Sequence, residues 1–340
     1  MHKIISFIES KRLHKKCVYC DIVFEWEDEL SKSLSLPLKF EKRSRKNFLR
    51  IMQRIGLLNF YQSWEERYST HRPVSYRFEM ISEWQKPSLL NKSTYIPHLI
   101  DFWVGRDHIK DFLYAYRRCP LIIASSAQVY HSLQPFLSER LIHNALSLPD
   151  KYAINASSSF DKQYDLIVLG RTSPVMMDML NRYSQRHQDF EYLYRVEQKD
   201  DFVIVTNKGK IIGEANSREA YMAFLRSSRI TLYATPGIDG NKVTNGYDPV
   251  TPRFLEAIAC GCHVLARYPK NEDTEYYQLQ DFSPHIENDD QFEVLLETAL
   301  ETKPDSEKRA RYLEKHYTST RACSLQEALT NQIVFNCGDI

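Results

Sequence analysis

Two arginines lie where a protein would bind a phosphate group. Arg171 follows the apolar run 164–169 after a single glycine, just before a helix predicted to begin at Pro174, and Arg253 lies in the first turn of a helix predicted over 251–261. A helix N-terminus presents unpaired N–H groups and a partial positive charge, so it stabilises anions. Arg253 alone would oppose that dipole at a cost of about 0.3 to 1 kcal/mol, which an anionic ligand would reverse. The two arginines therefore predict an anion site; the alternative for each is a solvated or salt-bridged surface side chain.

Two carboxylates accompany the second arginine. Asp248 and Glu256 are separated by seven residues, a spacing that can place one carboxylate in a loop and the other on the helix that follows. The ends of this helix are well marked, because Thr251 is a preferred N-cap, Pro252 a preferred first residue and Gly261 a preferred stop. The two acids can flank one ligand with hydroxyl groups as their partners, although two acids at this spacing are a weak pattern in a chain with 44 acidic residues.

Polar residues also follow apolar runs in the first half of the chain. His98 and Asp101 lie near the end of a possible strand over 95–103, and Ser125 ends the next apolar run, 120–124. His98 could orient or deprotonate an acceptor hydroxyl, because imidazole titrates near neutral pH. The alternative is a histidine with a structural role in an apolar stretch.

The elements that must position these residues alternate regularly after residue 160. This alternation predicts an α/β domain with a mainly parallel sheet, in which ligands gather outside the carboxyl ends of the strands. The pattern predicts strands over 164–169, 190–196, 229–236 and 263–269, a hairpin over 202–213, and helices over 172–187, 217–228 and 251–261.

The chain divides into two such domains in this interpretation. The four tryptophans all fall in the first 160 residues, and the short, serine-rich stretch 154–163 is typical of a linker. We therefore predict an acceptor-side domain over 1–155, a second domain over 160–315, and a helical C-terminal segment over 316–340. Two doubly wound domains with a cleft between them is the expected architecture.

Composition excludes several classes of protein. The 340 residues are 43% hydrophobic and 26% charged with a net charge of +1, which is typical of a folded chain and predicts no nucleic-acid partner. No apolar run is long enough to span a membrane and no secretory signal is recognised, so we expect a cytoplasmic protein. The chain has ten glycines, no GxGxxG and no P-loop motif, and its seven cysteines, Cys17 and Cys20 among them, indicate reduced thiols rather than a metal site.

One segment departs from the even charge balance. Residues 39–54 carry seven basic side chains and one acidic one, and Lys46, Arg50 and Arg54 recur every four residues opposite an apolar stripe. Such a basic amphipathic helix can rest on an anionic membrane. The alternative is a solvated helix that packs on its own domain.

Residues 160–270 resemble the donor-binding half of GT-B glycosyltransferases, in the metal-independent, family 4-like group with a Glu-x7-Glu motif. The resemblance implies that Arg171 binds the donor diphosphate, that Glu256 binds the ribose and that Asp248 faces the sugar. Two departures are an Asp in place of the first Glu and the lack of a Lys shortly after Arg171, for which Arg253 could substitute. The arginine before Glu256 resembles the capsule and spore-coat branch. The segment 316–340 is similar to the C-terminal helices that cross back onto the first domain.

The leading hypothesis is therefore a glycosyltransferase that moves a sugar from a UDP- or GDP-linked donor to a saccharide acceptor, with retention and without a metal or cofactor. We expect a role in bacterial surface polysaccharide synthesis, with a lipid-linked saccharide among the candidate acceptors and a peripheral position on the inner face of the cell membrane among the candidate locations. The alternatives are a sugar-nucleotide epimerase of the same fold and a non-catalytic scaffold. The candidate catalytic residues are Asp248, His98 and Arg253; those for donor binding are Gly170, Arg171, Thr172, Gly246, Tyr247, Thr251, Arg253 and Glu256; and those for the acceptor are His98, Asp101 and Ser125.

Overall fold

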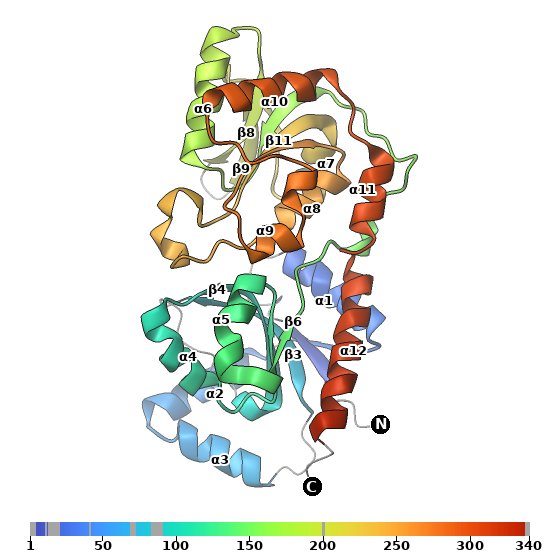
Figure 1. Ribbon diagram of the computed structural model, residues 1–340. Helices are drawn as coiled ribbons and strands as arrows, with labels where there is room; N and C mark the ends of the chain where they lie inside the picture. The colour runs from blue at the N-terminus through green and yellow to red at the C-terminus, as the bar shows by residue number, and fades with distance from the viewer. Residues whose placement is uncertain are drawn as a thin grey trace. The chain divides into compact units, whose positions relative to one another are not determined.

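The computed structural model describes residues 5–10, 12, 21–40, 42–68, 73–82, 91–198 and 201–336. The chain forms two compact units (Figure 1). Unit 1 comprises Met1–Leu146 and Thr318–Ile340, and unit 2 comprises Ser147–Tyr317. Cys17 and Cys20 lie outside the described residues, whereas Cys119, Cys260 and Cys262 are buried thiols and Cys323 is exposed.

Unit 1 is built on a parallel sheet of six strands in the order β2-β1-β3-β4-β5-β6. The strands are β1 (Phe7–Ser10), β2 (Leu38–Phe40), β3 (Ser75–Ser82), β4 (Tyr95–Trp103), β5 (Ile122–Ala124) and β6 (Leu141–His143). The helices are α1 (Asp21–Ser33), α2 (Arg43–Arg54), α3 (Leu58–Tyr68), α4 (Ile109–Tyr116), α5 (Ala127–Leu137) and α12 (Thr318–Asn336). The possible strand over 95–103 is therefore confirmed as β4.

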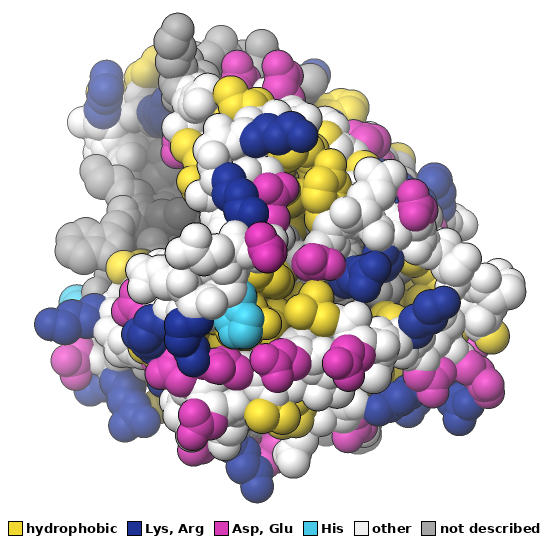
Figure 2. Space-filling model, turned by 90° about the horizontal axis from the view of Figure 1, so that it is seen from above, with side chains coloured by type: hydrophobic (Ala, Val, Ile, Leu, Met, Phe, Trp, Pro, Cys, Tyr) yellow, Lys and Arg dark blue, Asp and Glu magenta, His cyan; other side chains and the backbone are white. Residues whose placement is uncertain are grey.

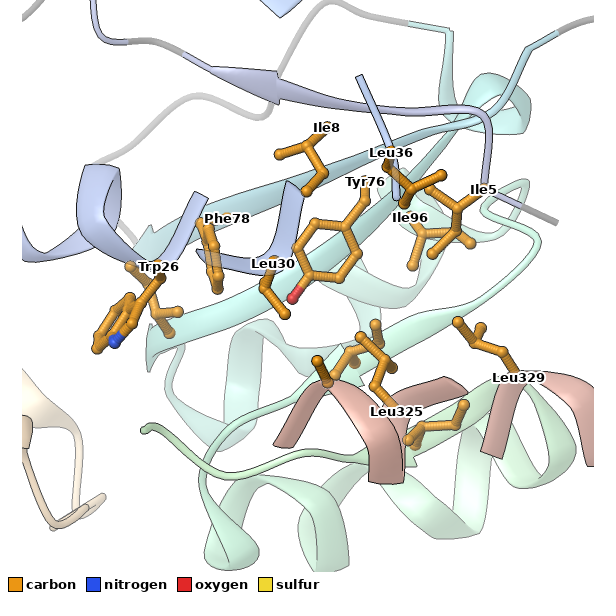
Figure 3. Close-up of a cluster of buried hydrophobic side chains, with 14 of the residues drawn as sticks. Ile5, Ile8, Trp26, Leu30, Leu36, Tyr76, Phe78, Ile96, Leu325 and Leu329 are labelled. Carbon is orange, nitrogen blue, oxygen red and sulfur yellow. The ribbon is translucent and has the colours of Figure 1, made fainter. Parts of the chain in front are cut away.

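The core of unit 1 joins residues from both ends of the chain. Tyr76 and Ile96 of the central strands are fully buried against Leu30 of α1 (Figure 3). The last helix, α12, adds Leu325 and Leu329 to the same cluster. The C-terminal helix is thus part of the hydrophobic core of unit 1, where it packs against α1.

The boundary between the units falls at Leu146, before the polar stretch that resembles a linker. Residues after Leu146 are bound into unit 2, because the Leu148 N–H donates to the carbonyl of His316 at 2.8 Å. The Ser157 N–H and hydroxyl both donate to Asn155 Oδ1. The serine-rich stretch is therefore a hydrogen-bonded turn inside unit 2, since its polar side chains satisfy its own backbone.

Unit 2 contains a second sheet of six strands, in the order β10-β9-β8-β7-β11-β12. Its strands are β7 (Tyr164–Val168), β8 (Tyr192–Gln198), β9 (Asp201–Thr206), β10 (Ile211–Glu214), β11 (Ser228–Ala234) and β12 (His263–Arg267). Strands β8, β7, β11 and β12 are parallel, and β9 with β10 forms the predicted antiparallel hairpin. The helices are α6 (Pro174–Arg186), α7 (Arg218–Ser227), α8 (Pro252–Ala259), α9 (Glu272–Tyr276), α10 (Asp289–Glu301) and α11 (Ser306–Leu313).

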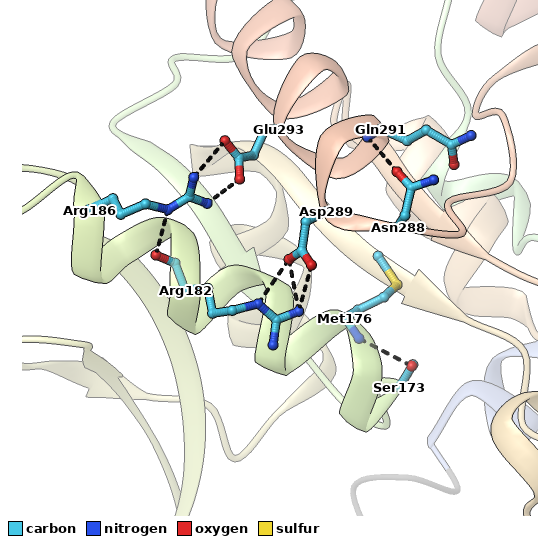
Figure 4. A network of polar contacts seen from close by, with 8 residues as sticks. All are labelled: Ser173, Met176, Arg182, Arg186, Asn288, Asp289, Gln291 and Glu293. Atoms are coloured by element: carbon cyan, nitrogen blue, oxygen red, sulfur yellow. Dashed lines mark hydrogen bonds and ion pairs between the residues drawn. The ribbon is translucent and has the colours of Figure 1, made fainter.

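Helix α6 is fixed at its start and along its outer side. The Ser173 hydroxyl caps it by accepting from the Met176 N–H at 3.3 Å. Further along, the Arg182 guanidinium makes a bidentate ion pair with Asp289 of α10, with its shortest N–O distance 2.8 Å (Figure 4). These contacts hold the helix that begins at the carboxyl end of β7.

The visible surface in Figure 2 mixes acidic and basic side chains rather than segregating them, in keeping with the net charge of +1. Within the part of the chain that the structure describes, no helix is long and apolar enough to cross a membrane.

Candidate functional site

Strand order in unit 2 identifies one edge of its sheet as the place to look for a ligand. Strands β7 and β11 are parallel neighbours, and the chain leaves β7 toward β8 on one side but reaches β11 on the other. This is a topological switch point, and in open α/β sheets ligands bind outside the carboxyl ends of the strands there. The loops after β7 and β11 lead into α6 and α8, so both helices begin at this edge.

Arg253 lies at this switch point and bridges the two strand ends. Its Nη1 donates to the carbonyls of Leu169 at 3.1 Å and Arg171 at 2.5 Å, and its Nη2 donates to the carbonyl of Ala234 at 3.3 Å. These carbonyls already compensate part of its charge, and the expectation that an anionic ligand reverses the unfavourable helix dipole stays a prediction.

The close approach of Arg253 requires a glycine beside it. Gly170 has φ +74°, and a Cβ there would lie 2.9 Å from Arg253 Nη1. A side chain at this position would meet both a backbone penalty and a steric clash. Thr172, two residues on, has a buried hydroxyl for which the described residues offer no hydrogen-bond partner. The Arg171 side chain is exposed at the same edge.

Helix α8 has the predicted boundaries. Thr251 is the N-cap, Pro252 the first residue, and Gly261 adopts φ +69° just past the end. The cap itself differs from the expectation, because the Thr251 side chain accepts no capping hydrogen bond. Its backbone N–H instead donates to Tyr233 Oη at 2.9 Å. The first turn of α8 therefore keeps its partial positive charge without a side-chain cap.

Asp248 lies in the loop between β11 and α8 and holds that loop together. Its Oδ1 accepts from the Gly237 N–H, and its Oδ2 accepts from the Thr235 hydroxyl at 2.9 Å. Burial raises the pKa of Asp248 to about 6 despite these hydrogen bonds, which act to lower it. A Cβ at Gly237 would lie 2.5 Å from the Tyr247 carbonyl, so only glycine fits there. In this structure Asp248 holds the loop together, and its expected place facing a sugar stays a prediction.

Glu256 is likewise enclosed rather than presented at the surface. It is 1% exposed, and its Oε1 accepts from Arg218 Nη2 at 2.7 Å. The Arg218 guanidinium lies 5.2 Å from the ring centroid of Tyr221 and 5.6 Å from that of Tyr152. Burial raises the pKa of Tyr221, and the neighbouring Glu256 carboxylate raises it further. The carboxylate expected to bind ribose is therefore closed over by an arginine and an aromatic ring in this structure.

Arg218 is the site residue that sequence reasoning missed. It is the first residue of α7, after the N-cap Ser217, which accepts from the Ala220 N–H at 3.1 Å. The sequence did contain a signal for it. Arg218 is a cation at the N-terminus of α7, where it opposes the helix dipole as Arg253 does in α8, and such a cation indicates a partner. In both cases the cation has a buried partner that local sequence does not reveal.

A second ion pair fixes the rim of the same edge. Asp239, with φ +63°, accepts from the Ser173 hydroxyl at the start of α6. Its other oxygen pairs with Arg267, the last residue of β12, at 2.8 Å. Burial alone would raise the pKa of Asp239, but the hydrogen bonds from Arg267 and Ser173 outweigh it and lower the pKa. The loop after β11 is thus tied to both neighbouring loops, whereas Gly246 within it has φ +85° and open space around its Cα.

The acceptor-side candidates lie in unit 1 and are mainly structural. His98 is 3% exposed; its Nε2 donates to the Asn144 carbonyl at 2.9 Å and its Nδ1 accepts from Tyr76 Oη. Burial lowers the pKa of His98 to about 3, in keeping with a neutral ring. These contacts favour the alternative of a structural histidine, and the acid–base role of His98 stays a prediction. Ser125 is also buried and donates to the Leu99 carbonyl at 2.8 Å, whereas Asp101 is half-buried beside a bulge in β4.

The comparisons with known proteins come in two kinds. Residues 190–327 match the family model described as "Glycosyl transferase-like". A search of curated proteins finds no matching relative. Among solved structures, AviGT4, a glycosyltransferase involved in avilamycin A biosynthesis, is similar with a TM-score of 0.50 and 14% identity over 80% of this chain and 79% of that one.

Two further structures are more distant. The GtfA/B complex gives a TM-score of 0.47 and 9% identity over 82% of this chain and 60% of that one. The pneumococcal O-GlcNAc transferase GtfA, solved with UDP and GlcNAc, gives a TM-score of 0.44 and 10% identity over 81% of this chain and 60% of that one. The expected GT-B fold is confirmed by the likeness to AviGT4. The match to the glycosyltransferase-like family model is confined to residues 190–327, and the likeness to AviGT4, at 14% identity, shows the fold alone.

Proposed function

We propose that the protein transfers a sugar from a UDP- or GDP-linked donor to a saccharide acceptor without a divalent metal, and that its donor diphosphate binds at the β7/β11 switch point. The observation that carries the proposal is the Arg253 guanidinium, held between the two strand ends at the uncapped N-terminus of α8. Arg171 adds an exposed cation on the adjoining loop. Fixed positive groups of this kind stabilise the charge that develops on a departing diphosphate.

The same geometry supports our proposal that the anomeric configuration is retained. An inverting transfer needs a general base to take the proton of the acceptor hydroxyl. The two candidates for that role, His98 and Asp248, are both engaged in internal hydrogen bonds. A route in which the leaving diphosphate itself receives the proton requires no such base.

We assign Glu256 and Arg218 to positioning rather than to direct contact with the ribose. Their ion pair joins the first turn of α7 to α8, and it therefore fixes the helix whose N-terminus faces the proposed phosphate. The capsule and spore-coat resemblance supports a growing bacterial surface polysaccharide as the acceptor, with the enzyme on the cytoplasmic side.

Calorimetric titration with UDP, GDP, dTDP, CMP and ADP tests the donor site. We expect one diphosphate to bind, and Arg171→Gln to weaken that binding by at least about tenfold, because a charge-assisted phosphate contact contributes about 1.5 to 3 kcal/mol. Arg182→Gln is the matched control, since Arg182 lies on α6 but pairs with Asp289. Equal affinity of both variants for the diphosphate would refute the site.

Product analysis separates the alternatives for the reaction. Incubation of the binding nucleotide sugar without acceptor gives an isomeric nucleotide sugar if the protein is an epimerase, and only slow hydrolysis if it is a transferase. Transfer to a saccharide acceptor with the donor's anomeric configuration is the expected result. Binding without turnover under any of these conditions would identify a non-catalytic scaffold.

A further inference from the structure

Exposed apolar side chains gather on one helical hairpin of unit 1. Of the thirteen large hydrophobic side chains that are exposed among the described residues, seven fall between Phe40 and Trp64. We define the α2–α3 face as the exposed residues of this hairpin, namely Phe48, Ile51, Ile55, Leu57, Phe60 and Trp64 with the basic Lys42, Arg45, Arg50 and Arg54. Scattered single hydrophobic residues are normal on a surface, but a contiguous group indicates an interaction site.

Helical spacing explains why these side chains face outward together. In α2, Leu49 is buried, whereas Ile51 on another face is 55% exposed, and Ile55, the C-cap residue four positions later, is 58% exposed. In α3, Phe60 and Trp64 are also four residues apart and are 71% and 51% exposed. Residues four apart lie on the same side of a helix, so each helix carries an outward apolar stripe.

An aromatic contact joins the two stripes into one surface. The ring centroids of Phe48 and Tyr61 are 5.1 Å apart in an edge-to-face arrangement, and those of Tyr61 and Trp64 are 6.3 Å apart. The two helices thus present one apolar surface with aromatic rings along it. Tyrosine and tryptophan of this kind are suited to the boundary between water and lipid, because each combines an apolar ring with a polar group.

The charge of the hairpin indicates which kind of partner binds the α2–α3 face. Residues 39–54 hold seven basic side chains and one acidic one in a chain whose net charge is +1, and α2 itself contains no acidic residue. Arg50 and Arg54 are both exposed, and Arg54 lies three residues after Ile51 at the border of the apolar stripe, so their long side chains can reach anionic groups there. Phosphates meet the arginines, whereas aliphatic residues such as Ile51 and Leu57 require an apolar phase beneath those phosphates. A lipid surface offers both, and a nucleic-acid backbone offers only the first.

We propose that the α2–α3 face binds the surface of a membrane that contains anionic lipids. This inference rests on the proposed function and deepens it, because an enzyme held at a bilayer takes an acceptor sugar that is attached to a lipid. Binding is reversible and interfacial: the apolar stripes enter the level of the headgroups while the arginines pair with lipid phosphates. Each cation at such a surface strengthens binding by about fivefold at moderate salt.

Sedimentation with lipid vesicles tests the proposal. We expect the wild-type protein to sediment with equimolar phosphatidylglycerol and phosphatidylcholine vesicles but not with phosphatidylcholine alone. Arg50→Gln/Arg54→Gln should weaken binding by about 25-fold, that is fivefold for each charge. Phe60→Ser/Trp64→Ser should reduce it at least as strongly, because it removes the two most prominent aromatic side chains of α3.

Matched variants separate this face from general charge and hydrophobicity. Phe136→Ser removes an aromatic side chain of α5 that is 57% exposed, and Lys110→Gln/Lys303→Gln removes two exposed cations elsewhere. Both controls should bind anionic vesicles as the wild type does. Thermal unfolding checks that the two α3 substitutions leave the protein folded, as expected for side chains already in solvent.

Three results would overturn the proposal: no binding of wild type to anionic vesicles, equal binding by all variants, or a dimer in sedimentation velocity that the Phe60→Ser/Trp64→Ser variant dissociates. The last would make the face a contact between two copies of the chain. Affinity for the diphosphate in solution is measured in parallel, because it should not change in the α2–α3 variants. The α2–α3 variants should lose vesicle binding and keep diphosphate binding, whereas Arg171→Gln should lose diphosphate binding and keep vesicle binding. The two proposals can therefore fail independently of each other.

Discussion

The Arg218–Glu256 ion pair permits the sharpest test of the site's construction. Arg218→Ala would leave the Glu256 carboxylate, 1% exposed, without the guanidinium that now lies 2.7 Å away. Removing one partner of a buried pair costs about 3 to 5 kcal/mol, because the other charge stays buried and uncompensated. For a unit of this size, each kcal/mol corresponds to about 2 to 4 °C, so the melting temperature of unit 2 should fall by about 6 to 20 °C.

Two further variants distinguish loss of the charge pair from loss of packing. Glu256→Gln keeps an oxygen that can accept from Arg218, whose cation also lies over the rings of Tyr221 and Tyr152, so a smaller loss of stability is expected. The double variant Arg218→Met/Glu256→Leu removes both charges and should be close to the wild type, since apolar replacement of a buried pair is often neutral. Arg229→Ala is the control, because the Arg229–Asp165 pair is exposed and 3.8 Å long.

The assay can follow the two units separately. All four tryptophans precede residue 104, so their fluorescence reports on unit 1, while far-ultraviolet circular dichroism reports on both units. We expect Arg218→Ala to shift the dichroism transition and leave the fluorescence transition in place. A loss of less than about 1 kcal/mol for Arg218→Ala, or a double variant as unstable as the sum of the single ones, would refute the buried pair.

Two other predictions follow from local geometry and titration. Gly170→Ala should destabilise unit 2 by about 1 to 3 kcal/mol in thermal unfolding and weaken diphosphate binding, because its Cβ would lie 2.9 Å from Arg253 Nη1; Gly209→Ala, with φ +84° and open space, should cost only the backbone strain and leave binding unchanged. Burial lowers the pKa of His98 to about 3 and that of His143 to about 4. Their folded pKa values lie below the unfolded one, so the stability of unit 1 is full above about pH 6.5 and falls as pH is lowered, by up to about 1.4 kcal/mol per pH unit for each histidine. His98→Gln should reduce this dependence of stability on pH, measured by urea unfolding between the folded and unfolded pKa values. An unchanged slope would contradict the assignment of His98 as a buried neutral histidine.

Local patterns were sufficient to predict the frame of unit 2. Alternating apolar runs and helical segments predicted its strands, and Pro174, Thr251 and Pro252 predicted where α6 and α8 begin. Such signals work because each depends on residues within a turn or two of one another. The same reasoning predicted a ligand outside the carboxyl ends of the strands, and the strand order of the structure then places the switch point there, between β7 and β11.

The roles of individual polar residues could not be predicted in this way. Glu256 meets an arginine 38 residues earlier, and Asp248 accepts from a backbone amide 11 residues before it. His98 finds its partners in Tyr76 and Asn144, 22 and 46 residues away. A buried polar group must be hydrogen-bonded, but the sequence does not say whether its partner is a ligand or another part of the chain.

Arg253 shows how one residue can hydrogen-bond within the chain and still be placed for a ligand. Three of the N–H groups of a guanidinium are engaged by strand-end carbonyls, so its orientation is set during folding rather than when a ligand arrives. A cation fixed in advance stabilises a developing negative charge without reorganisation, which is the condition for strong electrostatic catalysis. Glycine at position 170 suits this arrangement, because its φ is +74° and a Cβ there would lie 2.9 Å from Arg253 Nη1, so the guanidinium would have to shift away from the carbonyls of residues 169 and 171. The position of the Arg253 guanidinium therefore depends on Gly170, and substitution of either residue should impair the proposed diphosphate site.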